Sequence, residues 1–361
     1  MNDDIPPYAI VIPTLGRPCL AACLAALAAS AGPVPEEIVI VDDSRGPGRP
    51  FLPLAALGEL QDRTRVLRTA GRGPAAARNA GWRALHTPWA VFLDDDVRVS
   101  PRWRTDLAAD LADAEPRLAG IQGIIEVPLP QDRRPTDWER NTAGLTAARW
   151  ATADMAYRTT VLEAVGGFDE RFPRAFREDA DLALRVLDAG HRLIRGARVT
   201  EHPVRPADRW VSLRNQAGNA DDALMRRLHG PRWHRRAGAP RGRLPGHAAV
   251  TAAGALTAAL ALGGRRGAAA VAAAAWALGT AEFARARIAP GPRTRSEVLT
   301  MLATSAALPP LAVGHRLRGT WHHRHAQPLA HPAPESVRAV RDLPVTPVHR
   351  EPPVHGGKEP W

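Results

Sequence analysis

The stretch Trp89–Asp96, which reads WAVFLDDD, joins five apolar residues to three consecutive carboxylates. A short apolar run that ends abruptly in charge predicts a buried strand whose carboxyl end opens onto a site. Side chains alternate along an extended chain, so we expect Asp94 and Asp96 on one side and Asp95 on the other. Two carboxylates on one side suit a hard divalent cation that also holds phosphate groups. From these residues alone, the alternative is an acidic loop at the end of a strand.

The residues before this stretch predict strands that alternate with helices. Apolar runs predict the strands and segments rich in Leu or Ala predict the helices, in the order 8–13 (strand), 18–32 (helix), 37–41 (strand), 65–68 (strand) and 75–85 (helix). Such alternation is typical of an α/β fold with a mostly parallel sheet and helices on both faces. The second strand runs into Asp42-Asp43. Because ligands bind at the carboxyl ends of the strands in these sheets, we expect the acidic groups along one functional rim.

The chain from 101 to 228 continues in the same manner but less regularly. Its predicted elements are a helix at 101–113, a strand at 118–127, a Pro-rich loop at 128–140, an extended segment at 152–157, a short helix at 162–165, a helix at 178–190, a strand at 192–199 and a helix at 207–228. Glu178 and Asp179 open one of these helices. Acids in that position complement the helix dipole, so a structural role stands beside a catalytic one.

An ordered set of short motifs runs through residues 8–230. The motifs are Val11-Ile12-Pro13-Thr14, Val41-Asp42-Asp43-Ser44, Ala77-Arg78-Asn79-Ala80-Gly81, Leu93 to Asp96, Gly166 to Phe172, and Glu178-Asp179 followed by Leu182. Together they resemble family 2 glycosyltransferases, the inverting enzymes with the nucleotide-sugar-binding GT-A fold. Processive members carry Gln-x-x-Arg-Trp after the base, and residues 215–219 do not match it. The resemblance is therefore to non-processive, rhamnosyltransferase-like members, and it implies the transfer of a single sugar.

The resemblance implies a catalytic base and a metal site. Asp179 would take the proton from the attacking acceptor hydroxyl, with Glu178 as the second choice for this role. Asp94, Asp96 and His202 would hold Mn²⁺ or Mg²⁺, and a histidine ligand slightly favours Mn²⁺. The ion would stabilise the charge that the leaving diphosphate gains.

The resemblance also implies donor and acceptor contacts. The donor would be a UDP-, dTDP- or GDP-sugar, and its contacts would be Pro13, Thr14, Asp43, Arg78, Asp94 and Asp95. Acceptor contacts would be Asp154 and Asp169. Two positions depart from the family pattern: Ser44 follows Asp43 where a glycine is more common, and Asp154 stands before Met155 where an asparagine is usual.

Charge is distributed unevenly along the 361 residues. The formal net charge is +11, yet residues 1–202 hold 25 Arg against 28 acidic residues, so the surplus belongs to the C-terminal part. This asymmetry predicts contact with a polyanion or with an anionic membrane face. Cys19 and Cys23 are interpreted as small apolar core residues, because their spacing fits neither a disulfide framework nor a zinc site. The acidic N-terminus leads straight into a strand, so we expect no signal peptide and a cytoplasmic catalytic domain.

The predicted organisation has four parts. They are a GT-A catalytic domain at 1–230, a basic linker at 231–246, an Ala-rich helical region at 247–320 and a disordered tail at 321–361. The helical region contains three weakly apolar stretches, two of them separated by Arg265-Arg266. Helices packed on the catalytic domain would explain them, as would helices in or on a membrane. The Arg-rich flanks favour membrane association, at the inner face of the cell membrane, with a glycan or lipid-linked acceptor of the cell envelope.

Two other functions compete with glycosyl transfer. Sugar nucleotidyltransferases share a similar fold, but they need a Gly-rich loop after the first strand and a catalytic lysine. Here that turn is Pro13-Thr14-Leu15-Gly16-Arg17, and the single lysine is Lys358. A non-enzymatic scaffold could bind membrane or nucleic acid through the basic second half. No nucleic-acid motif accompanies the arginines, so we expect no nucleic-acid partner.

Overall fold

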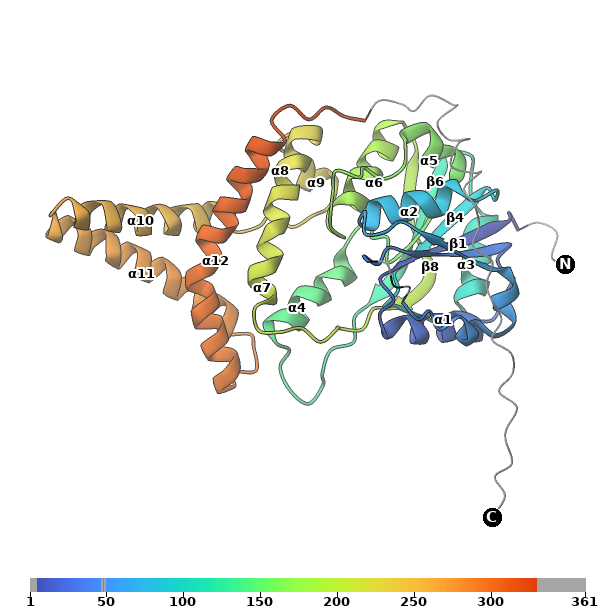
Figure 1. The fold of residues 1–361 in the computed structure, drawn as a ribbon, viewed down its shortest axis with the longest axis horizontal. Helices are drawn as coiled ribbons and strands as arrows, with labels where there is room; N and C mark the ends of the chain where they lie inside the picture. Colours follow the sequence, from blue (N-terminus) through green and yellow to red (C-terminus); the bar gives the residue numbers. More distant parts are fainter. Residues whose placement is uncertain (1–4, 47, 49, 330–361) are drawn as a thin grey trace, which may run out of the picture.

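The computed structural model of the protein describes residues 5–46, 48 and 50–329, and these contain one eight-stranded sheet (Figure 1). The strands are β1 (Tyr8–Thr14), β2 (Glu37–Asp42), β3 (Thr64–Arg68), β4 (Trp89–Leu93), β5 (Arg98–Val99), β6 (Leu118–Glu126), β7 (Asp154–Arg158) and β8 (Arg192–Glu201). Their spatial order is β3-β2-β1-β4-β7-β6-β8-β5. Strand order reverses at β1, which pairs with both β2 and β4. That reversal is where sheets of this class bind ligands.

The sheet is mostly parallel, as predicted. Strands β1 to β4 run in one direction, and β6 pairs parallel with β8. Strand β7 runs antiparallel to β4 and β6, and the short β5 runs antiparallel to β8. The mixed, curled sheet with helices on both sides confirms the predicted GT-A type of fold.

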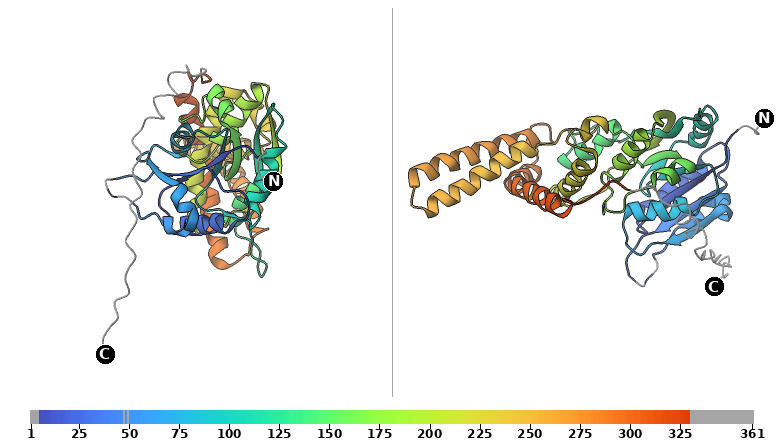
Figure 2. Two further views of the ribbon diagram at one scale, coloured as in Figure 1. Left: turned by 90° about the vertical axis from the view of Figure 1, so that its right-hand side faces the viewer. Right: turned by 90° about the horizontal axis from the view of Figure 1, so that it is seen from above.

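Helices cover both faces of the sheet (Figures 1 and 2). In the α/β part they are α1 (Cys19–Ala29), η1 (Leu54–Arg63), α2 (Pro74–Arg83), α3 (Trp103–Ala112), α4 (Asp137–Ala143), η2 (Gly144–Ala147), α5 (Thr159–Val165) and α6 (Glu178–Asp188). Alternation along β1 decides which face each residue enters. Ile10 and Ile12 pack with α1 and α3, whereas Ala9 and Val11 pack with α2, α5 and α6. Both faces are therefore dry, which explains the continuous apolar runs of these strands.

Two segments differ from their predicted secondary structure. The end of the loop predicted at 128–140 instead begins helix α4 (Asp137–Ala143), because Thr136 and Glu139 make a capping box around its first turn. The helix predicted at 207–228 is broken into α7 (Val211–Arg214), the 3₁₀ turn η3 (Asn215–Ala217) and α8 (Gly218–His229). The predicted basic linker contains the short helix α9 (Trp233–Arg236).

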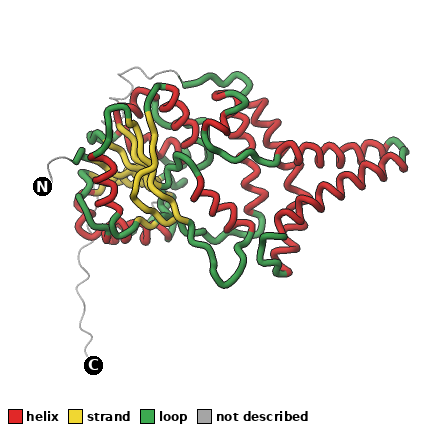
Figure 3. Tube along the Cα trace, turned by 180° about the vertical axis from the view of Figure 1, so that it is seen from behind, coloured by secondary structure: helices red, strands yellow, loops and turns green. Residues whose placement is uncertain are grey.

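Three long helices form the C-terminal part, at the end of the molecule opposite the sheet (Figure 3). They are α10 (Leu244–Leu262), α11 (Arg266–Ile288) and α12 (Arg295–His322). Helices α10 and α11 make a hairpin that extends away from the rest of the structure, and α12 crosses its base (Figure 1). By length and composition, each of the three could cross a membrane.

The four-part division of the chain stays a prediction, with two observations at its edges. Helix α12 continues through Pro309-Pro310 and ends at His322, just inside the predicted tail. The remainder of that tail, from 330 onward, lies outside the described residues.

Candidate active site

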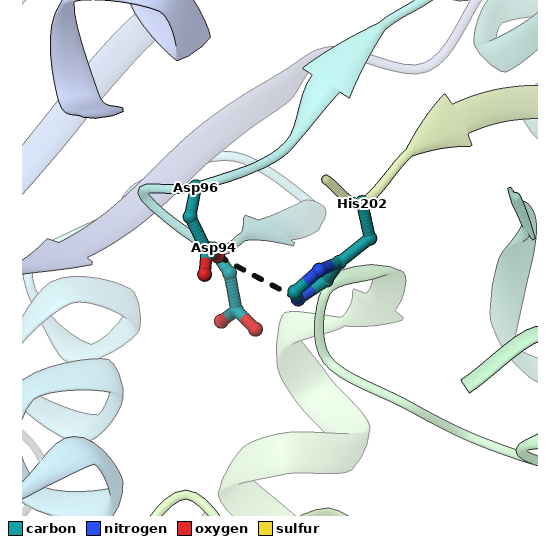
Figure 4. A group of neighbouring side chains, drawn as sticks. All are labelled: Asp94, Asp96 and His202. Carbon is teal, nitrogen blue, oxygen red and sulfur yellow. Dashed lines mark ion pairs between the residues drawn. The ribbon is translucent and has the colours of Figure 1, made fainter. Parts of the chain in front are cut away.

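The Asp triplet lies at the end of β4 and faces the end of β8. Asp94, Asp96 and His202 each offer a ligand atom, and these atoms all lie within 4.8 Å of one another (Figure 4). The backbone N–H of His202 donates to the carbonyl of Glu126 at 2.7 Å, which fixes the end of β8 beside β6. Two distant parts of the chain thus bring two carboxylates and an imidazole together.

Asp95 points the other way, as the predicted alternation requires. Its carboxylate accepts from the Thr14 hydroxyl at 2.6 Å and from Arg17 at 3.2 Å, and it is buried. Thr14 also accepts the backbone N–H of Gly16. Asp95 therefore fixes the turn after β1, where Pro13 and Thr14 are predicted to contact the donor.

The cluster has the chemistry of a divalent-metal site. Two carboxylates and one imidazole suit Mn²⁺, and the carboxylates alone suit Mg²⁺. Burial raises the pKa of Asp96, and the negative charge of Asp94 adds to this effect. Nδ1 of His202 is buried and has no hydrogen-bond partner among the described residues. Concentrated negative charge and an unpartnered imidazole nitrogen both fit a bound cation.

Arg78 connects the predicted metal site to the predicted base. Its side chain is buried, and it donates to Asp94 at 2.8 Å and to Glu178 at 2.7 Å. The planar guanidinium can hold two carboxylates at fixed angles, which a lysine ammonium cannot do. The predicted role of Arg78 was contact with the donor diphosphate. In this structure the two NH groups of its fork are engaged by carboxylates instead.

Glu178 and Asp179 differ in their access to solvent. Glu178 is buried; burial and the neighbouring Asp179 raise its pKa, while Arg78 opposes the rise. Its Oε2 has no partner among the described residues. Asp179 is only half-buried, and its Oδ1 accepts the N–H of Ala180 at 2.7 Å. Burial raises the pKa of Asp179 as well.

The segment before Glu178 and Asp179 is held in place by side chains of α8. Arg177 adopts a left-handed conformation, with φ of 78°, at the start of α6. Its guanidinium pairs with Asp222 of α8 at 2.8 Å, and Arg174 pairs with Asp221 at 3.1 Å. Backbone strain of this kind persists only where surrounding contacts determine it. Helix α8 therefore positions the acidic pair.

The segment Ala77–Gly81 joins the site to the sheet. The Asn79 side chain accepts the N–H of Phe168 at 2.9 Å and donates to its carbonyl at 2.8 Å, so it fixes the Gly166–Phe172 segment. A Cβ on Gly81 would lie 2.3 Å from Cγ1 of Val11. Glycine is thus required for α2 to approach β1 closely enough to place Arg78 at the rim.

Asp43 organises the loop that follows β3. Its carboxylate accepts from the Thr69 hydroxyl at 2.6 Å and from three consecutive backbone N–H groups, those of Gly71, Arg72 and Gly73. This arrangement shapes the start of α2. Contact between Asp43 and a nucleotide stays a prediction.

The structure buries the two predicted acceptor residues. Asp154 is fully buried and bonds to Arg198, Trp103 and Thr200, all between 2.6 and 2.7 Å. Asp169 is also buried, and both of its oxygens bond to Arg171. Neither carboxylate has surface left for an acceptor hydroxyl. Both side chains hold parts of the fold together, and their contact with an acceptor stays a prediction.

Sequence reasoning missed two arginines at the rim. Arg205 pairs with Asp96 at 2.9 Å and is partly exposed, and Arg17 pairs with Asp95. Arg205 follows His202 by three residues, so its closeness to the predicted metal ligand was the available signal. Trp138 of α4 donates its indole N–H to the Arg205 carbonyl at 2.7 Å and anchors this segment.

Comparison with known proteins shows which proteins this chain resembles. Residues 9–160 match the family model described as "Glycosyl transferase family 2". Two strains of Mycobacterium tuberculosis have a relative named "Pre-mycofactocin glycosyltransferase", 32% identical over 133 residues. That match covers 34% of this chain and 28% of the relative, so the two share only a part of their lengths.

A solved structure resembles most of the chain. The mannosyltransferase from Pyrobaculum calidifontis, in complex with GDP-Man and Mn²⁺, aligns with a TM-score of 0.50 and 19% identity. The alignment covers 88% of both chains. At that identity the likeness concerns the fold. The comparisons therefore agree on two points: residues 9–160 are similar to glycosyl transferase family 2, and the sheet is of the GT-A type.

Proposed function

We propose that this chain is a glycosyltransferase that moves one sugar from a nucleotide diphospho-sugar to an acceptor hydroxyl with inversion. The observation that carries the proposal is the Asp94–Asp96–His202 cluster at the rim, linked through Arg78 to the Glu178–Asp179 pair. A cation seat and a carboxylate base side by side are what this chemistry needs. The donor class would be a UDP-, dTDP- or GDP-sugar.

Different residues of the chain serve different parts of the transfer reaction. Asp179 accepts the proton of the acceptor hydroxyl as its oxygen bonds to the anomeric carbon and the bond to the diphosphate oxygen breaks. Asp94, Asp96 and His202 would hold a divalent ion, which would supply positive charge for the leaving diphosphate. Arg78 holds Asp94 and Glu178 in fixed positions, and Asp95 fixes the turn that would receive the nucleotide.

Exposure favours Asp179 over Glu178 as the base. Glu178 is 2% exposed and bonded to Arg78, whereas Asp179 keeps exposed surface at the start of α6. A group that takes a proton from a substrate must be reachable by it. Glu178 then acts as the partner that keeps Arg78 in place.

Ligand binding tests the proposal. We expect the apparent melting temperature to rise with one of UDP, GDP or dTDP, and to rise further with Mn²⁺, since a ligand of the native state stabilises it by mass action. GDP-Man and Mn²⁺, named with the Pyrobaculum protein, are the first ligands to try. Asp96→Asn should abolish the metal-dependent part, and the exposed Asp113→Asn should not. If no nucleotide shifts the folded protein, with or without Mn²⁺, the proposal is wrong.

A further inference from the structure

The α10–α11 hairpin exposes many apolar side chains. Leu262, Val271 and Leu278 are 91%, 73% and 72% exposed, and none of the apolar window of α10 is buried. Gly254 lies against Trp276, and Gly279 lies against Val250, so the two helices pack closely on each other. A helix that is apolar all round is normally buried in a core or in a bilayer. The protein body covers neither helix along most of its length (Figure 1).

Charged residues lie at both ends of the hairpin and are absent from its middle. Residues 244–264 contain no Asp, Glu, Lys or Arg, and neither do residues 267–281. A helical run of 21 residues is about 30 Å long, close to the thickness of the hydrocarbon layer of a membrane. Arg265 and Arg266 lie at the tip, and Arg243 pairs with Glu282 at the base. Arginines at both ends suit the two headgroup layers.

Helix α12 lies differently. One face is buried against the body, with Met301, Leu308 and Ala312 among its members, and Gly319 lies against Ala220 of α8. The opposite face exposes Leu299, Leu302, Leu317 and Trp321. Helix α12 crosses the base of the hairpin (Figure 1). Such a helix fits the plane of a membrane surface.

Polar contacts hold the base of the hairpin and α12 to the catalytic region. The buried Arg287 of α11 donates to Asp137 of α4 at 2.7 Å and to Thr304 of α12 at 2.7 Å. Glu297 of α12 accepts the backbone N–H of Asp137 at 2.9 Å. These contacts fix α12 outside any hydrocarbon layer that the hairpin enters.

We infer that the α10–α11 hairpin crosses the hydrocarbon layer of a lipid bilayer and that α12 lies along its surface. Of three helices with the length and composition of a span, the structure assigns two to the bilayer. The inference rests on exposure, length and charge rather than on the proposed function, and it deepens that function by placing the site beside a membrane. A hydrocarbon layer between two anionic headgroup layers matches both the apolar middle and the arginines at each end.

Vesicle flotation of the full chain tests the apolar requirement. The wild type should float with phosphatidylglycerol–phosphatidylcholine vesicles. Leu256→Asp with Leu278→Asp should lower the bound fraction by more than about tenfold, because carboxylates inside hydrocarbon are strongly disfavoured. Phe51→Asp, at an exposed apolar residue of the catalytic region, should leave binding unchanged. If the double variant floats as well as the wild type, the inference is wrong. It is also wrong if the wild type forms a lipid-free dimer that does not float.

Single cysteines test whether the hairpin crosses. With Cys19 and Cys23 replaced by alanine, Arg266→Cys reports the tip and Phe51→Cys reports the body. When the protein is added from outside to preformed vesicles, a maleimide that cannot cross the membrane should label Phe51→Cys and leave Arg266→Cys unlabelled until the vesicles are dissolved. Labelling of both positions on intact vesicles would place tip and body on one side and reject the crossing. Nucleotide and Mn²⁺ binding by Leu256→Asp with Leu278→Asp should stay unchanged, so failure here and failure of the proposed function are distinguishable.

Discussion

The α/β region and the helical hairpin are both rich in apolar residues, but they use them in opposite ways. In the sheet, Val11 and Phe92 are completely buried between two layers of helices. In the hairpin, Val271 and Leu278 are mostly exposed. An apolar pattern therefore predicts that a segment leaves water, but it does not say whether protein or lipid takes the water's place. The same kind of substitution should therefore have different effects on activity and stability in the two regions.

The largest difference between substitutions in the two regions is expected in the rate of catalysis. Asp179→Asn should lower the turnover number by roughly 100- to 10,000-fold, the usual contribution of a general base. Asp188→Asn, on the same helix and exposed, should have little effect, and so should Leu256→Asp with Leu278→Asp on a soluble acceptor. Initial rates with saturating donor make the comparison.

The same experiment has a pH dependence with a definite sign. A base acts only when deprotonated, and burial raises the pKa of Asp179. Wild-type activity should therefore fall on acidification at a higher pH than an ordinary aspartate would give. An acid limb at an ordinary aspartate pKa would argue against Asp179 as the base.

The next difference concerns stability. Phe92 packs edge-to-face on Phe168 with ring centroids 5.1 Å apart, and Phe92→Ala should lower the free energy of unfolding by about 3–5 kcal/mol. Leu278→Ala should change it by less than about 0.5 kcal/mol, because an exposed side chain loses no protein contacts. Denaturant unfolding in mild detergent measures both. A large loss from Leu278→Ala would mean that protein, not lipid, covers the hairpin.

The smallest difference lies within α12. A Cβ on Gly319 would lie 2.5 Å from Cα of Ala220, so Gly319→Ala should destabilise the protein by about 1–3 kcal/mol through overpacking. The same change at Gly314, where nothing lies within 4 Å, should stabilise the helix by about 1 kcal/mol. Thermal unfolding compares the pair. If both changes are neutral, α12 does not pack on α8 as described.

Local patterns predicted most of the fold and the centre of the site. The alternation of Asp94, Asp95 and Asp96 was enough to assign them to two sides of the chain where β4 ends. The antiparallel direction of β7 was not predictable, because nothing in five residues encodes the direction of their neighbours. Helix α4 was missed because the prolines before Thr136 obscured a capping box that the sequence does contain.

Long-range pairing explains why the surroundings of Asp154 were not predictable. Asp154 was predicted to contact the acceptor because Asp154-Met155 resembles the acceptor-side Asn-Met segment of the family, and a buried aspartate needs compensation. That compensation comes from Arg198, which follows it by 44 residues in the chain and lies on another strand. No local motif links the two positions. The burial of Asp154 therefore could not be predicted from the residues around it.

The position of α12 in the chain bears on how the protein is made. Arg174 and Arg177 depend on Asp221 and Asp222 of α8, and α12 packs on α8 next to them. Because translation proceeds towards the C-terminus, the hairpin leaves the ribosome before α12. We expect a nascent chain to meet the lipid first and to complete the support of its catalytic segment afterwards. Biosynthesis would then itself delay sugar transfer until the enzyme has reached its place of work.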